Sequence, residues 1–205
     1  MTEEELMQRM VMSSSLVSNK KIANKKMTEH DWDKISKATS AILNTNLFID
    51  DDASRTVPEM QSMCRRLKRK KGLDLVIIDY LQYVQSSINS SRREQIEQVS
   101  RDLKRMAKEL NVPVIVISSL SRKNEMREDK RPILSDLRET GQIEFDADVV
   151  MFIHREEYYN PDTEKRGIAE IIVAKHRKGP IGIAELGWIG ELTKFVDIER
   201  LERRY

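Results

Sequence analysis

A short run of aliphatic residues that ends on a carboxylate places the strongest constraint on how this chain folds. Leu75 to Ile78 contains only leucine, valine and isoleucine, and this pattern predicts a strand buried on both faces, as in a parallel sheet. The run ends at Asp79, at the carboxyl end of the strand, where open α/β sheets bind their ligands. In nucleotide hydrolases an acid at this position holds the Mg²⁺ that bridges the phosphates. The alternative is a buried strand whose final aspartate is only a cap.

The usual partner of such an acid is missing from the sequence. Nucleotide hydrolases with a Mg²⁺-holding aspartate commonly cradle the phosphates in a G-x-x-x-x-G-K-[ST] loop. This chain has seven glycines, and none of them is followed by Lys-Ser or Lys-Thr.

Strands alternate with helices along most of the chain. Helices are predicted where apolar residues recur at helical spacing, and strands where short apolar runs or alternating residues are bounded by turns. One helix is predicted to start at Thr2, and further helices are predicted at 28–42, 56–71 and 92–110. Strands are predicted at 47–49, 75–78, 114–117, 148–153, 168–175, 181–189 and 194–198. Loops are predicted at 13–26, 85–91 and 120–132. The expected fold class is therefore α/β, with a mainly parallel sheet, helices on both of its faces and antiparallel strands at the C-terminal end.

Composition restricts the class of protein. The length of 205 residues suits one domain of ordinary size or most of a larger one. The net charge of +2 balances 36 basic against 34 acidic residues, so a basic binding surface requires clustering. The single cysteine, Cys64, excludes an internal disulfide and a cysteine zinc site, and fits a reducing compartment. Apolar runs fall short of the roughly 18 residues that a membrane span needs. We expect a cytoplasmic protein without a membrane partner.

Four stretches of the sequence form one pattern: LVIIDYLQ, ELNVPVIVISSLSR, DKRPILSDLRETGQIEFDADVVMFIHREEYYNPD and AEIIVAKHRKGPIG. Together they resemble the C-terminal motor domain of the replicative hexameric DNA helicases of the DnaB type, from residue 1 to about residue 200. The resemblance implies a RecA-like ATPase core that forms a homo-hexameric ring and holds ATP between adjacent subunits. It implies that residues 1–205 are this motor domain, incomplete at its N-terminal side, since the chain opens directly on a helix.

The resemblance also implies roles for individual residues. Asp79 matches the acid that organises Mg²⁺ through water, and Lys175 and Arg177 match a basic pair that completes the ATP site of the neighbouring subunit. An arginine offers a planar fork to the charge that develops during phosphoryl transfer. Lys175 and Arg177 are two residues apart along a strand, so their side chains are predicted to project to the same side. The alternative is a solvated cationic strand end before a Gly-Pro turn.

Residues that contact single-stranded DNA are implied in the same way. Arg138, Glu139 and Gly141 match the loop that faces the central channel of the ring. Gly141 has no side chain to keep a phosphate away from its amide, and arginine contacts to phosphates are independent of sequence and weakened by salt. Arg92 and Arg93, at the end of the 85–91 loop, are further candidates. The alternative for them is a surface loop whose arginines merely open a helix.

The chain departs from the family pattern at two places. The phosphate loop and the catalytic glutamate that follows it would lie upstream of Met1. The strand that ends Val-Ile-Ser-Ser usually ends Leu-Ser-Gln in this family, where the glutamine senses the γ-phosphate and relays to DNA. Here that position is Ser119, whose hydroxyl is too short to span the same gap.

Two functions therefore follow from the sequence. The first is an ATP-dependent replicative helicase motor that moves on single-stranded DNA and unwinds duplex at the replication fork, with primase and a helicase loader as implied partners. The second is a non-hydrolysing subunit or fragment that joins a ring and binds DNA without an ATP site of its own. A recombinase or circadian-clock ATPase of the same core fold fits the 136–155 stretch less well.

Overall fold

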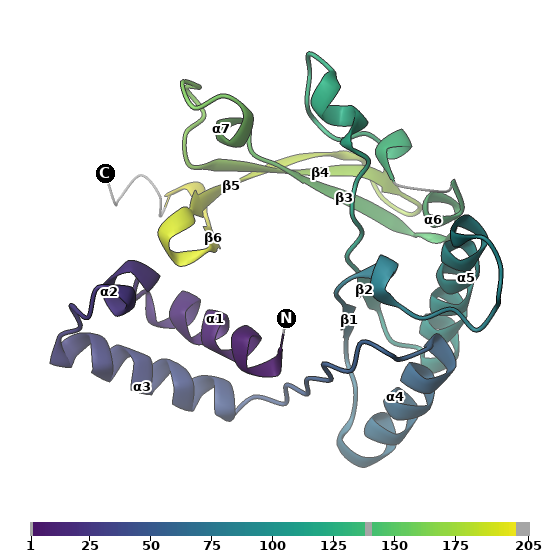
Figure 1. Cartoon of the computed structure of the whole chain (residues 1–205), viewed down its shortest axis with the longest axis horizontal. Coiled ribbons are helices and arrows are strands. Elements are labelled where there is room, and N and C mark those ends of the chain that lie inside the picture. The colour runs from purple at the N-terminus through teal and green to yellow at the C-terminus, as the bar shows by residue number, and fades with distance from the viewer. Residues whose placement is uncertain (1, 138–140, 200–205) are drawn as a thin grey trace. The chain divides into compact units, whose positions relative to one another are not determined.

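The computed structural model describes residues 2–137 and 141–199. Residues 52–154 and 172–183 form one compact unit, and the rest of the chain forms a second. Helices and strands alternate through the first of these units, as Figure 1 shows, and the α/β class is confirmed. Among the described residues, no helix has the length and apolar character needed to cross a membrane.

Three helices open the chain: α1 (Glu3–Ser15), α2 (Asn19–Ala23) and α3 (Glu29–Leu43). The capping box predicted at Thr2 is present. Helix α1 packs on α3 through a small apolar cluster of Val11, Met12, Ala38, Ile22, Ile35 and Ile42. The predicted loop at 13–26 is partly wrong, because α1 continues to Ser15 and α2 follows it. Polar residues extend α1 here without apolar periodicity, and the helix ends only at Leu16, which adopts a left-handed conformation (φ 58°).

The predicted strand at 47–49 is also wrong, since residues 46–52 have no regular secondary structure. Leu47 and Phe48 are 45% and 51% exposed. Strand propensity requires a neighbouring strand and a covered face before it produces a strand, and this segment has neither in the described residues.

Asp31 fixes the start of α3 and provides a test of this unit. Its carboxylate accepts hydrogen bonds from Lys21 Nζ (3.0 Å) and from the Thr28 hydroxyl (2.9 Å). The Lys21 bond, followed by the Thr28 bonds, lowers the pKa of Asp31 to about 2 from 3.8. A carboxyl whose pKa is lower in the folded state stabilises that state above its ordinary pKa, and the stabilisation is lost as the pH falls through the folded-state value.

We expect Asp31→Asn to lower the melting temperature of the chain at neutral pH, and the difference from the wild type to disappear by about pH 2. Thermal unfolding followed by circular dichroism over this pH range measures it. The matched control is Asp33→Asn, because Asp33 makes an exposed ion pair with Lys37 on the same helix, and such pairs contribute little. A constant difference between Asp31→Asn and the wild type at all pH values contradicts the assignment.

The unit formed by residues 52–154 and 172–183 is built on the predicted parallel strands. Helix α4 (Val57–Lys71) starts at a capping box of Thr56 and Glu59 and ends at Gly72, which has φ +86°. Strand β1 (Val76–Ile78), helix α5 (Arg92–Leu110) and strand β2 (Val114–Val116) follow. Strands β1 and β2 pair in parallel, with Val76 opposite Val114. These elements confirm the predicted helices at 56–71 and 92–110 and the strands at 75–78 and 114–117.

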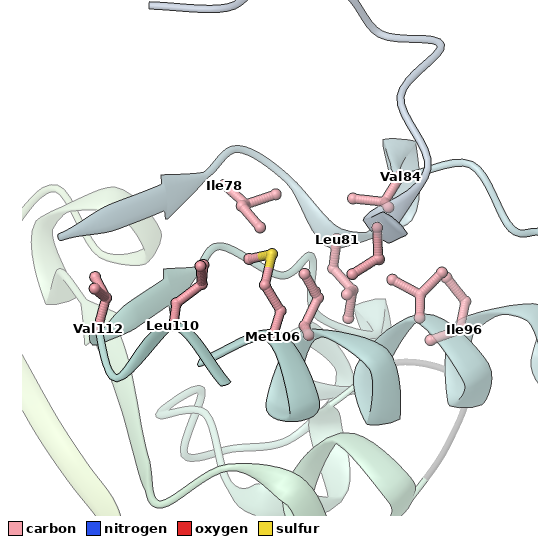
Figure 2. Close-up of a cluster of buried hydrophobic side chains, with 10 residues drawn as sticks. Ile78, Leu81, Val84, Ile96, Met106, Leu110 and Val112 are labelled. Carbon is pink, nitrogen blue, oxygen red and sulfur yellow. The ribbon is translucent and has the colours of Figure 1, made fainter. Parts of the chain in front are cut away.

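The core of this unit lies between α5 and one face of β1 and β2, as Figure 2 shows. Ile96 and Met106 of α5 are completely buried, which the helical spacing of apolar residues predicts. The opposite face of the two strands is open: Ile77 is 61% exposed and Ile115 is 45% exposed. The prediction that Leu75–Ile78 is buried on both faces is therefore wrong for the described residues, where helices cover only one side of β1 and β2.

A second sheet contains four strands in the order β3–β4–β5–β6: β3 (Val149–His154), β4 (Ile168–His176), β5 (Gly182–Ile189) and β6 (Lys194–Val196). Strands β5 and β6 pair antiparallel, which confirms the predicted antiparallel strands at the C-terminal end. We predicted β3 as a third strand of the parallel core, but it pairs with β4 instead. Buried and exposed residues alternate along β3, so only one face of this strand is covered, unlike a strand in the middle of an all-parallel core.

Two short helices flank β3: α6 (Gly141–Asp146) precedes it, and α7 (Glu156–Tyr159) follows it. The tight turn between β4 and β5 depends on Gly179. A Cβ atom at this position would lie 2.4 Å from the His176 ring, so a larger residue requires the turn or the ring to move.

Candidate functional site

The carboxyl ends of β1 and β2 carry the first group of candidate residues. Because the two strands are parallel neighbours, these ends meet at the same side of the sheet. Asp79 follows β1 and is exposed, whereas Ser118 and Ser119 follow β2 and are partly buried. We call Asp79, Gln82, Ser118 and Ser119 the strand edge. An exposed carboxylate at this position is accessible to a hydrated cation.

Gln82 joins the two strand ends. After Asp79 the chain turns across the end of β2, and the Leu81 amide donates to the Ile117 carbonyl at 2.8 Å. The side chain of Gln82 then lies against β2: its Nε2 donates to Ser118 Oγ at 3.1 Å, and its Oε1 accepts from the Ser119 amide at 3.3 Å. No pattern in the sequence predicted Gln82 as a site residue.

Ser119 has an unusual environment. Its Oγ atom is buried and has no hydrogen-bond partner among the residues that the structure describes. A buried hydroxyl without a partner costs free energy, so such an atom requires an explanation. In this conformation the hydroxyl is not accessible to a ligand. The main-chain groups of Ser119 make hydrogen bonds instead: its amide donates to Gln82 Oε1, and its carbonyl accepts from Ser118 Oγ.

The second group consists of Lys175 and Arg177, which we call the basic pair. Both side chains reach the last carbonyls of α6. Lys175 Nζ donates to the Glu144 carbonyl, and the Arg177 guanidinium donates to the Phe145 carbonyl at 2.5 Å. The final carbonyls of a helix lack partners within the helix and attract cations. The shared target shows that the two side chains project to the same side, as the alternation along the strand predicts.

Asp148 holds Arg177 in place. The Arg177 amide donates to the Asp148 carbonyl at 2.9 Å, and the guanidinium lies 3.5 Å from one carboxylate oxygen of Asp148. The other carboxylate oxygen accepts from Lys104 of α5. The hydrogen bond from Lys104, together with the charges of Arg177 and Lys108, lowers the pKa of Asp148. The carboxylate therefore stays ionised at neutral pH and keeps its attraction for Arg177.

Of the three residues predicted for the loop that faces the central channel, the structure describes Gly141. Arg138 and Glu139 lie outside the described residues. Gly141 is the first residue of α6, and a Cβ atom built there meets nothing within 4 Å. The packing of this chain alone therefore does not require glycine at position 141.

Arg92 and Arg93 are the first two residues of α5, which starts at a capping box formed by Ser91 and Glu94. The Arg92 guanidinium donates to the main-chain carbonyl of Gln82. Arg93 Nε donates to Glu97 one turn along the helix, at 3.1 Å. The structure therefore connects Arg92 to the strand edge, while Arg93 is 71% exposed at its side chain.

Comparison with known proteins identifies the class to which these features belong. The profile of the family described as "DnaB-like helicase C terminal domain" matches residues 1–197. The chain belongs to this DnaB-like family. The resemblance stated from the four sequence stretches is thereby confirmed.

Individual DnaB-like relatives agree with this assignment. The replicative DNA helicase DnaB of Geobacillus stearothermophilus and the replicative DNA helicase DnaC of Bacillus subtilis (strain 168) are each 44% identical over 202 residues, which is 98% of this chain. The replicative DNA helicase DnaB of Haemophilus influenzae is 42% identical over 209 residues. The chain spans 44% of the length of each of these relatives.

Solved structures of the DnaB-like class have the same fold. One of them, described as an ATPase domain, has a TM-score of 0.92 and 44% sequence identity, and the match covers 96% of this chain and 71% of that chain. A structure of a DnaB-like replicative helicase and its interactions with primase also has a TM-score of 0.92, with 48% of that chain covered. The predicted RecA-like ATPase fold is confirmed.

Two residues of this DnaB-like site were not found from the sequence. Gln82 lies three residues after Asp79 in the LVIIDYLQ stretch, but its contacts depend on the turn that follows the strand. Asp148 stands at the start of a strand, where a lone carboxylate has no periodic pattern to distinguish it. Both became visible only through hydrogen bonds to residues far away in the sequence.

Proposed function

We propose that this chain is the motor segment of an ATP-dependent replicative DNA helicase that moves on single-stranded DNA and unwinds duplex at the replication fork. The observation that carries the proposal is the family match over residues 1–197, with replicative helicases as relatives at 42–44% identity. In this proposal the motor domain assembles as a homo-hexameric ring in the cytoplasm and uses ATP and Mg²⁺.

The strand edge is proposed to face the nucleotide. Mg²⁺ prefers oxygen ligands and keeps several of its waters, and Asp79 is an exposed carboxylate at the position where α/β sheets bind phosphates. Within residues 2–137 and 141–199, no group of three or more His, Cys, Asp or Glu side chains could hold a metal ion. At the strand edge, Asp79 would therefore hold the ion through water, and phosphate oxygens would be its further ligands. When bound, Mg²⁺ would neutralise charge on the phosphates.

The basic pair is proposed to act in the ATP site of the neighbouring subunit. A guanidinium has five N–H donors, and the recorded contacts of the Arg177 side chain are with Phe145 and Asp148. The Arg177 side chain is 44% exposed, so donors remain for a phosphate. Held by Asp148 and the end of α6, the guanidinium is pre-oriented, which reduces the entropy lost when it binds.

Contacts with single-stranded DNA are proposed for Arg138, Glu139 and Gly141, and for Arg92 and Arg93 at the start of α5. These residues supply positive charge and main-chain amides, which suit phosphates of any sequence. Primase and a helicase loader are proposed as partners. The structure of a DnaB-like replicative helicase with its primase interactions, which shares this fold, supports the first of them.

A chimera tests this function. Residues 1–197 replace the matching segment of the Geobacillus stearothermophilus replicative helicase, which is 44% identical to this chain. We expect the chimera to form rings, to hydrolyse ATP faster when single-stranded DNA is present, and to separate the strands of a forked duplex. The unaltered relative is the control for ring mass, ATP turnover and unwinding. A chimera that forms rings and binds DNA but hydrolyses no ATP would reject the motor function.

That rejecting result would favour the second candidate, a ring-joining DNA-binding subunit that does not hydrolyse ATP itself. One observation favours this candidate: the Ser119 hydroxyl is buried and has no hydrogen-bond partner among the described residues.

A further inference from the structure

Gln82 is the residue where the strand edge and the start of α5 meet. Its side chain contacts the end of β2, through Ser118 Oγ and the Ser119 amide. Its main-chain carbonyl accepts from the guanidinium of Arg92, the first residue of α5. One partly buried residue is therefore in contact with two segments that are far apart in the sequence.

The contacts of the Gln82 amide leave it able to bind a ligand. The nitrogen carries two N–H donors, and Ser118 Oγ is its recorded acceptor in the described part of the chain. The oxygen is directed at the Ser119 amide, which fixes the orientation of the whole amide group. A second N–H is thus available at the strand edge, three residues after Asp79.

The second N–H of Gln82 is important because the Ser119 hydroxyl is buried. A phosphate-sensing role at position 119 requires a polar group that a nucleotide can reach, but the serine hydroxyl is buried and unpartnered in the described residues. Gln82 is longer than serine, has a fixed amide and already contacts the Ser119 main chain. It can therefore respond to an occupied strand edge where the serine hydroxyl cannot.

We propose that Gln82 is a positioning residue that couples nucleotide at the strand edge to the start of α5. A shift of its amide toward a phosphate would move the Gln82 carbonyl and, through it, Arg92. This inference rests on the proposed function, since it requires a nucleotide at the strand edge and DNA near Arg92. Coupling is reciprocal, so DNA bound near Arg92 also changes the position of the amide.

The test uses the chimera and measures coupling instead of activity alone. Affinity for a fluorescent single-stranded oligonucleotide is measured by anisotropy, with and without a non-hydrolysable ATP analogue, and the ratio of the two dissociation constants is the coupling. Typical coupling between sites is on the order of 5- to 150-fold. We expect Gln82→Ala to reduce the ratio by about tenfold. Gln82→Glu keeps the shape but loses the N–H donors, and we expect the same loss.

Ser119→Gln provides a rescue. Introduced together with Gln82→Ala, it restores an amide at the same edge, and we expect it to recover most of the lost coupling. The matched control is Gln61→Ala, because the Gln61 amide donates to the exposed Glu109 carboxylate on α5, which is not part of the strand edge; its coupling should equal that of the wild type. Circular dichroism melting confirms that each variant is folded.

The outcomes separate the two proposals. If the wild-type chimera neither hydrolyses ATP nor responds to the analogue, the proposed function fails. If the wild-type chimera shows coupling and Gln82→Glu retains it in full, the role of Gln82 is overturned while the proposed function stands. Loss of coupling in both Gln82 variants, with recovery by Ser119→Gln, supports the inference.

Discussion

Replacing Arg177 with alanine is expected to lower the ATP turnover of the chimeric ring by about 10³-fold or more. A guanidinium placed at a phosphoryl group neutralises charge that develops only in the transition state, so its loss should appear in kcat and leave KM for ATP little changed. Arg177→Lys should also be strongly impaired, because an ammonium keeps the charge but not the planar fork. Steady-state ATP hydrolysis at saturating single-stranded DNA is measured for the unaltered chimera, Arg177→Ala and Arg177→Lys.

The neighbouring cation supplies the control. Lys178 is exposed in the same turn, so Lys178→Ala removes one positive charge at almost the same place. We expect its turnover to stay within about twofold of the wild type, as for other exposed surface charges. Arg177 also caps α6 through Phe145, so melting temperatures and ring mass must be compared. A folded, hexameric Arg177→Ala chimera with normal kcat contradicts the role of the basic pair.

Asp79→Asn is expected to lower turnover of the chimera by about 10²-fold or more, since charge stabilisation by a bound metal ion contributes several kcal/mol. The amide has the size of the carboxylate but not its charge, so the loss should be accompanied by a higher Mg²⁺ concentration for half-maximal rate. A titration of ATP hydrolysis with Mg²⁺ measures both effects. Asp74→Asn, at an exposed position before the same strand, is the matched control. An unchanged Mg²⁺ requirement in Asp79→Asn would remove Asp79 from the metal site.

Together the two variants distinguish the motor from a ring-joining subunit. The 205-residue chain is mixed with the intact Geobacillus relative, and ATP turnover of the mixed rings is followed as the fraction of this chain increases. If the chain only donates its basic pair, Arg177→Ala changes the turnover and Asp79→Asn does not. If the chain also binds nucleotide through its own strand edge, both substitutions lower it.

The helices and the parallel strands could be predicted because their signals are local. The apolar residues of α5 recur at helical spacing, and this stripe is the part of the helix that is buried. The strand with which a given strand pairs is not encoded locally, because pairing depends on the rest of the fold. Asp148–Ile153 resembles β1 in composition, yet β3 pairs with β4, and the alternation of buried and exposed residues along it is seen only in the folded structure. The exposure of Ile77 likewise depends on what covers the sheet, which a run of aliphatic residues does not specify.

The candidate site was predictable to the extent that it follows strand geometry. Asp79 is found from the end of a strand, and the common side of Lys175 and Arg177 from the two-residue period of a strand, although Arg177 lies one residue after β4. Their roles came from the family resemblance and not from the pattern. Gln82 and Asp148 were missed because each acts through hydrogen bonds across 36 to 44 positions of sequence, and those depend on how the turns fold.

Helix α5 gives these separate contacts a mechanical relation. Its first residue, Arg92, bonds to Gln82, and three turns later Lys104 bonds to Asp148, which in turn holds Arg177. At a rise of about 1.5 Å per residue, the two attachment points are about 18 Å apart along one axis. A helix that is packed in a core keeps its length when it is displaced, so the two attachment points move together. A displacement of α5 at Arg92 would therefore also move Lys104 and, through Asp148, Arg177.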